Sequence, residues 1–181
     1  PAVPVSGSAM LASLKHYNYR IFFFGQIISL TGTWMQMVAE GWLVYELTGS
    51  PLALGLMRFL HTIPVTLFTF YGGVIAARFN KRTILVVTQS FALVMSLLLY
   101  AMAVKGAIQV WQVGVLAFGL GMTNAFDIPT RPSFVVDMVG KQDLTNAIAL
   151  NSSVFNSSRT ICSAIAGLVL ILVGVAGCFP L

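Results

Sequence analysis

The hydrophobic pattern divides the chain into five long apolar segments that are separated by short polar stretches. These segments are predicted to be membrane-spanning helices over residues 20–46, 52–77, 83–104, 110–128 and 144–176. Each is long enough, because a helix that crosses the hydrocarbon core needs about 20 mostly apolar residues. Proline lacks a backbone N–H, so Pro51 is expected at the start of the second helix and Pro129 and Pro132 are expected to end the fourth.

The two ends of the chain are interpreted separately from these spans. Residues 1–19 are predicted to be a cytoplasmic N-terminal segment, since they contain no signal-peptide pattern. Residues 20–181 are predicted to form one partial helical bundle, in which 177–181 begin a sixth helix.

The last predicted span carries a polar stripe within its apolar sequence. When the span is wound as an α-helix, one face carries Ser152, Asn156, Arg159 and Ser163. Arg159 lies roughly 22 Å along the helix from Leu144. A guanidinium at that depth costs several kcal/mol unless it meets water, a counter-charge or backbone carbonyls. We therefore expect this face to line a polar cavity, although purely structural pairing of Arg159 is the alternative.

The stripe and one residue of the first span give the candidates for a substrate-binding cavity. They are Arg159, Asn156, Asn151, Ser152 and Gln36. For the two asparagines, hydrogen bonding between helices is about as good an explanation as substrate binding.

Charged residues inside the spans form two predicted pairs. Glu40 and Arg58 are equally far from Gly49 in the first hairpin, so antiparallel helices would bring them to similar depth and a salt bridge is expected. The alternative is that each charge reaches the outer interface separately. Glu40 is also the leading candidate to carry a proton. Asp127 and Arg131 lie one helical turn apart and are expected to pair at the inner end of the fourth span.

Composition and charge support a membrane protein and predict its orientation. The chain is 57% hydrophobic and 8% charged, whereas soluble domains carry about a quarter charged residues. The net charge of +5 is spread thinly, so nucleic acid is not an expected partner. With the N-terminus in the cytoplasm, nearly all basic loop residues lie inside, as the positive-inside rule requires, and only Lys105 lies in an outer loop.

The chain contains no combination of residues that is typical of an enzyme. Its two histidines and two cysteines show no metal-ligand spacing, and neither a phosphate-binding glycine loop nor a nucleophile motif is present. We therefore predict no catalytic residue, no metal site and no cofactor.

Several motifs together resemble one protein family. The loop that contains Gly73, Arg78, Lys81 and Arg82 resembles the cytoplasmic loop signature of the major facilitator superfamily. The stretches 19–20, 24–26, 32–36, 41–51 and 126–132, with Asn151, Asn156 and Arg159, resemble its enterobactin-exporter-like branch, the transmembrane secretion effectors. The resemblance covers nearly all of residues 15–176, and the motifs occur in the right order.

The resemblance implies an all-α integral membrane protein of twelve helices in two halves, of which this chain would be the N-terminal half-bundle. Such a protein is a secondary active transporter that works by alternating access. It would export a small molecule such as a siderophore or a drug, driven by protons, across the bacterial inner membrane. The conformational loop of the family would comprise Gly73, Arg78, Lys81 and Arg82.

The chain departs from the family pattern in three respects. Ala77 stands where the loop signature has an acidic residue, and Cys162 and Ser163 stand where a Gly-Pro is usual. The chain is also short, so the C-terminal half of the transporter is expected as a partner beside the lipid bilayer and the substrate. The alternative is a truncated membrane scaffold or assembly partner that does not transport.

Overall fold

The computed structural model describes residues 12–106, 108–140 and 143–173 and places nearly all of them in helices. The helices are η1 (Ala12–Lys15), α2 (Tyr17–Thr48), α3 (Pro51–Arg78), α4 (Lys81–Val104), α5 (Val110–Val139) and α6 (Leu144–Val173). The described residues contain no strand, which confirms the all-α prediction for this part of the chain. The predicted start of a sixth span, at 177–181, lies outside the described residues.

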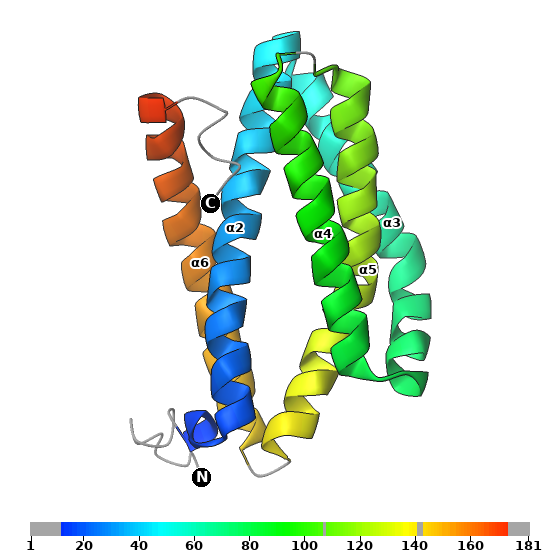
Figure 1. The fold of residues 1–181 in the computed structure, drawn as a ribbon, viewed down its shortest axis with the longest axis vertical. Coiled ribbons are helices and arrows are strands. Elements are labelled where there is room, and N and C mark those ends of the chain that lie inside the picture. The colour runs from blue at the N-terminus through cyan, green and yellow to red at the C-terminus, as the bar shows by residue number, and fades with distance from the viewer. Residues whose placement is uncertain (1–11, 107, 141–142, 174–181) are drawn as a thin grey trace.

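The five long helices run alternately up and down and form two groups (Figure 1). Helices α3, α4 and α5 form one group, in which α5 packs against both of its neighbours. Helix α6 packs along α2, and these two helices form the other group. The helices α2 and α3 are consecutive in sequence, yet they contact each other much less than α3 contacts α5.

Short turns with defined caps set the helix ends. Gly49 has a φ of 61°, which is the left-handed conformation that glycine adopts without a steric penalty, and its N–H bonds to the Tyr45 carbonyl. Pro51 begins α3, where its missing N–H has no partner to lose. The Asn80 side chain accepts a hydrogen bond from the Arg82 backbone N–H and so caps α4.

The tightest contact in the bundle joins α3 to α5. A Cβ atom on Gly72 would overlap the Ala125 carbonyl, and one on Gly121 would overlap the His61 carbonyl and lie 2.6 Å from Pro64 Cγ. Small residues permit such an approach of two backbones, as is common between membrane helices. The imidazole of His61 adds a hydrogen bond to Asn124, with 3.1 Å between Nε2 and Nδ2.

The prediction that Pro129 and Pro132 end the fourth helix is wrong, because α5 continues through both to Val139. A proline inside a helix removes a hydrogen bond and bends the axis, and Figure 1 shows the yellow end of α5 turned towards α2 and α6. The bend lets Val135 and Val139 pack against Tyr19 and Ala147 in one buried cluster. Tertiary packing therefore sustains a helix that sequence rules would end.

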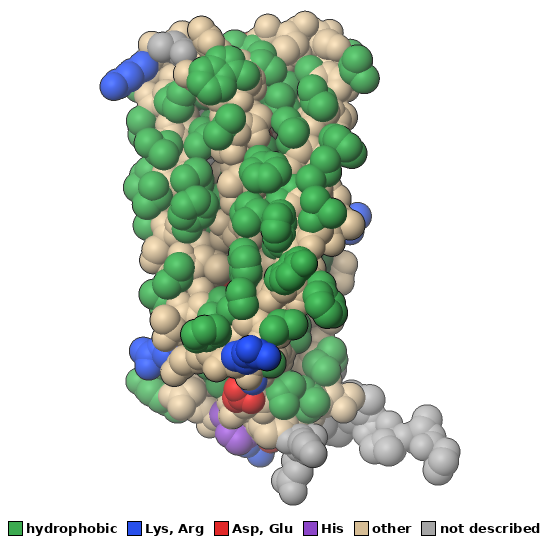
Figure 2. All heavy atoms as spheres, turned by 90° about the vertical axis from the view of Figure 1, so that its right-hand side faces the viewer, with side chains coloured by type: hydrophobic (Ala, Val, Ile, Leu, Met, Phe, Trp, Pro, Cys, Tyr) green, Lys and Arg blue, Asp and Glu red, His purple; other side chains and the backbone are tan. Residues whose placement is uncertain are grey.

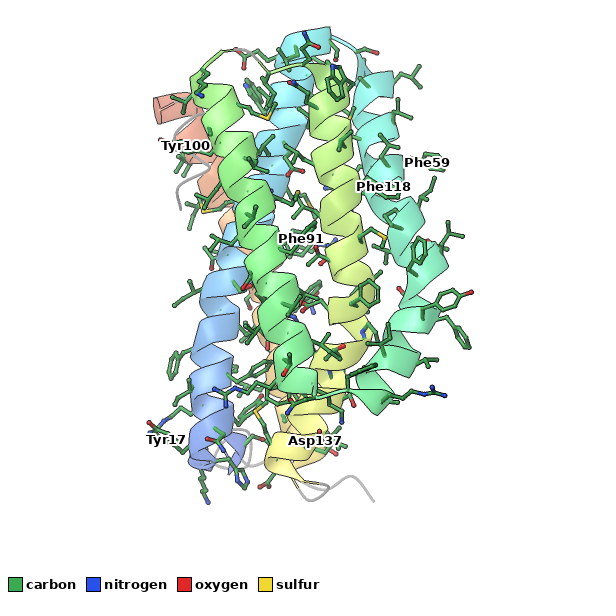
Figure 3. The ribbon with its side chains drawn as sticks, turned by 45° about the vertical axis from the view of Figure 1, so that its right-hand side comes forward. Tyr17, Phe59, Phe91, Tyr100, Phe118 and Asp137 are labelled. Atoms are coloured by element: carbon green, nitrogen blue, oxygen red, sulfur yellow. The ribbon has the colours of Figure 1, made fainter. Side chains whose placement is uncertain are left out.

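The surface has the character of a protein that lies in a bilayer. Figure 2 shows apolar side chains over most of one face and most of the charged side chains near its lower end. Phe59 on α3, which is 58% exposed, projects outward (Figure 3). Within the described residues, α2, α3 and α4 are long and apolar enough to cross a membrane. The spans predicted over 110–128 and 144–176 stay predictions.

Candidate functional site

An open pocket of about 570 Å³ lies between α2, α3 and α6. Its wall comprises Trp34, Met37, Val38, Gly41, Trp42, Tyr45, Leu54, Arg58, Arg159, Thr160 and Ser163. Ligand pockets in proteins span about 300–1,000 Å³ and combine apolar walls with a few polar groups. This pocket has both properties, and it is the best candidate for a functional site in the described part of the chain.

Helix α6 divides its polar residues between two faces. The face towards α2 contains the buried residues Ala147, Ser158, Cys162 and Ala166. The Asn151 amide oxygen accepts a hydrogen bond from the Gln26 amide on α2, so Asn151 joins two helices. Arg159 and Ser163 instead line the pocket.

The other two candidates on the stripe do not reach this pocket. Ser152 and Asn156 are exposed, and the Asn156 amide donates to the Ser152 carbonyl on its own helix at 2.8 Å. The structure therefore brings one of the four cavity candidates on α6, Arg159, into the pocket.

The predicted salt bridge between Glu40 and Arg58 is absent from the ion pairs of the described residues. Glu40 accepts a hydrogen bond of 2.7 Å from the Gln36 amide on its own helix. Arg58 instead lines the pocket that Arg159 also lines. The spacing from a hairpin turn concerns depth, and it does not determine which face of each helix a side chain occupies.

Two polar bridges connect the parallel helices α2 and α4. The Ser29 hydroxyl donates to the Gln89 amide oxygen at 2.8 Å. About two helical turns higher, the Ser96 hydroxyl donates to the Gln36 amide oxygen at 2.5 Å. Gln36 therefore links α4 to Glu40 and does not line the pocket itself.

A buried polar cluster around Asp127 lies beside the bridge from Ser29 to Gln89. Asp127 on α5 forms the expected ion pair with Arg131. Its carboxylate also accepts from the Thr88 hydroxyl at 3.1 Å and from the Gln89 amide at 3.4 Å. Asp127 is only 5% exposed, so these bonds compensate most of the cost of burying its charge.

The four residues of the predicted conformational loop lie on the helices beside the α3–α4 turn: Gly73 and Arg78 on the last part of α3, and Lys81 and Arg82 at the start of α4. Lys81 forms an ion pair of 2.6 Å with Asp137 on α5 and donates to the Ser133 carbonyl. Arg78 and Arg82 are exposed. Gly73 is not at a close helix contact, because nothing lies within 4 Å of a Cβ built on it.

Sequence reasoning missed several residues of these sites. Trp34, Trp42 and Tyr45 line the pocket, and apolar aromatic residues in a membrane span gave no sign of it. The Trp34 indole N–H is buried and has no acceptor among the described residues, while its ring packs edge-on against Phe155. Asp137 gave no signal in the sequence, because its partner Lys81 lies 56 positions earlier in the chain.

Comparison with known proteins establishes the family. The model of the transmembrane secretion effectors matches residues 8–181, which is nearly the whole chain. The chain belongs to this family of the major facilitator superfamily. The resemblance carried by the sequence motifs is thereby confirmed, and the family is one of membrane transporters.

Curated relatives of this transporter family are similar at low identity. The Staphyloferrin A transporter of Staphylococcus aureus is 26% identical over 83% of this chain and 38% of its own length. Macrolide efflux protein A of Streptococcus pyogenes is 23% identical over 85% of this chain and 39% of its own length. The chain thus spans less than half the length of these relatives. No solved structure matches the chain significantly.

Proposed function

We propose that this chain is the N-terminal part of a secondary transporter of twelve helices that exports a small molecule by alternating access. The observation that carries the proposal is the pocket between α2, α3 and α6, in a chain of a transporter family. The pocket would be one wall of the central cavity, and the C-terminal half of the transporter would form the opposite wall.

Export is supported by a relative whose name states efflux, the macrolide efflux protein. The substrates named for the relatives, a siderophore and a macrolide, suggest two compounds with which a search should begin. The residues of this chain that would meet substrate are Arg159 and the aromatic side chains of the pocket.

Proton coupling is proposed for Glu40. It lies about two turns before the end of α2, and hydrogen bonds connect it through Gln36 to Ser96 on α4. A carboxylate that gains or loses a proton there would make or break a link between two helices, which is what coupled transport requires. Asp127 is less suited to this role because its carboxylate is already engaged by Arg131, Thr88 and Gln89.

The test is transport by the native protein, expressed from its complete reading frame and reconstituted in proteoliposomes. Staphyloferrin A and a macrolide are the first compounds, with a pH gradient applied across the membrane. We expect gradient-dependent flux of at least one compound, and at least about a tenfold loss in Glu40→Gln. Flux that is independent of the gradient, or that is unchanged in Glu40→Gln, would overturn the proposed coupling.

A further inference from the structure

Two arginines of the pocket lie on different helices but line the same space. Arg58 is on α3 and Arg159 is on α6, and both are exposed to the pocket. Neither takes part in an ion pair among the described residues. Two guanidiniums at membrane depth repel each other and are costly without a compensating charge.

The nearby carboxylate of Glu40 compensates this charge only in part. Its field reaches Arg58, but its hydrogen bond goes to Gln36 on the same helix. One acidic group against two cations leaves the site with net positive charge. An anion that entered the pocket would find both guanidiniums free of competing ion pairs with the described residues.

The remaining wall of the pocket is apolar and aromatic. Trp34, Trp42 and Tyr45 present ring surfaces, with Met37, Val38 and Leu54 beside them. Such rings bind flat apolar groups by stacking. The site thus combines cations for an anionic group with a surface for an apolar group.

We propose that this pocket binds a small carboxylate with an apolar or aromatic body, held by Arg58 and Arg159 together. The planar guanidinium matches a carboxylate with two parallel hydrogen bonds, which are stronger than neutral ones. The inference rests on the proposed function, because it names the class of substrate for the same pocket.

The experiment measures binding by calorimetry to the native protein from its complete reading frame, purified in neutral detergent. The probes are 2-naphthoate and its uncharged isostere 2-naphthamide. We expect 2-naphthoate to bind and 2-naphthamide to bind at least about tenfold more weakly, since a charge-assisted hydrogen bond is lost. Arg58→Gln and Arg159→Gln should each weaken 2-naphthoate at least about tenfold.

Matched variants separate loss of the site from loss of the fold. Lys105→Gln removes an exposed cation at the end of α4, outside the pocket, and should leave 2-naphthoate binding unchanged. Arg58→Lys and Arg159→Lys keep the charge but lose the bidentate geometry, so their affinities should fall between those of the native protein and the glutamine variants.

A second source of the same anionic chemistry is a lipid headgroup. Dihexanoyl-phosphatidylglycerol is therefore titrated beside 2-naphthoate. Binding of this lipid, but not of 2-naphthoate, in an arginine-dependent manner would overturn the substrate proposal and assign the pocket to lipid. Equal binding of 2-naphthoate to the native protein and to both glutamine variants would also overturn the substrate proposal. In that case, gradient-driven flux of an uncharged compound would still support the transporter proposal.

Discussion

The buried carboxylate of Asp127 combines three contacts in one position, with Arg131, Thr88 and Gln89. Asp127→Asn would leave the Arg131 guanidinium partly buried without its counter-charge. Breaking a buried pair in this way costs about 3–5 kcal/mol. We expect a loss of unfolding free energy in that range, measured by unfolding in a graded series of SDS and mild detergent.

The control for this prediction is the same substitution on the same helix. The side chain of Asp137 is 54% exposed, and its partner is the Lys81 ammonium. Exposed ion pairs contribute about 0–1 kcal/mol, so Asp137→Asn should change stability by no more than that. Equal losses in the two variants would contradict the burial argument.

At the residue scale, the sequence predicted depth better than direction. The cost of a guanidinium far along an apolar helix predicted a cavity beside Arg159, and Arg159 lines the pocket. For Arg58, depth suggested a bond to Glu40, whereas the side chain faces the pocket. The direction of a side chain depends on how α2, α3 and α6 are rotated, and that rotation is set by contacts between helices that one sequence does not reveal.

At the element scale, the positions of single glycines decide how closely α3 and α5 approach. Gly121→Ala would place a Cβ against the His61 carbonyl and 2.6 Å from Pro64 Cγ. Backbone and proline ring have little room to move, so overpacking of about 1–3 kcal/mol is expected. SDS unfolding of the purified protein measures this loss.

Gly119→Ala is the matched variant, two positions earlier on α5. Its Cβ would lie 3.4 Å from Met95 Sδ, an ordinary contact with a flexible side chain. Alanine also favours a helix over glycine by about 0.5–1 kcal/mol. We expect Gly119→Ala to be neutral or slightly stabilising, and a loss as large as that of Gly121→Ala would argue against close backbone packing as the cause.

The presence of each helix was easier to predict than where the helix ends and which helices pack against it. Apolar length and the turn at Gly49 and Pro51 placed the first three elements within a few residues of α2, α3 and α4. The helix end predicted at Pro129 was wrong because the packing of Val135 and Val139 against α2 and α6 outweighs the local cost of a proline inside a helix. Gln89 and Ser96 are two of the few polar residues of α4. Both bond to α2, while exposed apolar residues form the outer face of α4.

At the scale of the whole molecule, charge is distributed between two ends. Three basic residues flank the turn between α3 and α4, namely Arg78, Lys81 and Arg82. Asp137 lies at the same end as Tyr17 (Figure 3). Lys105 lies near the opposite end, just beyond α4.

The motifs of the sequence were sufficient to find the family, because they follow one another in order along the chain and need no knowledge of packing.

The last prediction concerns the orientation of the chain in the membrane. Cytoplasmic loops are enriched in Lys and Arg, so the end with Arg78, Lys81 and Arg82 should face the cytoplasm. In a protein whose native cysteines are replaced by serine, Lys105→Cys should react with a membrane-impermeant maleimide on intact spheroplasts. Asp137→Cys should react only after the membrane is permeabilised, since it lies at the basic end. Both positions are exposed, so a difference between them reports sidedness rather than burial, and the reverse labelling pattern would place the N-terminus outside.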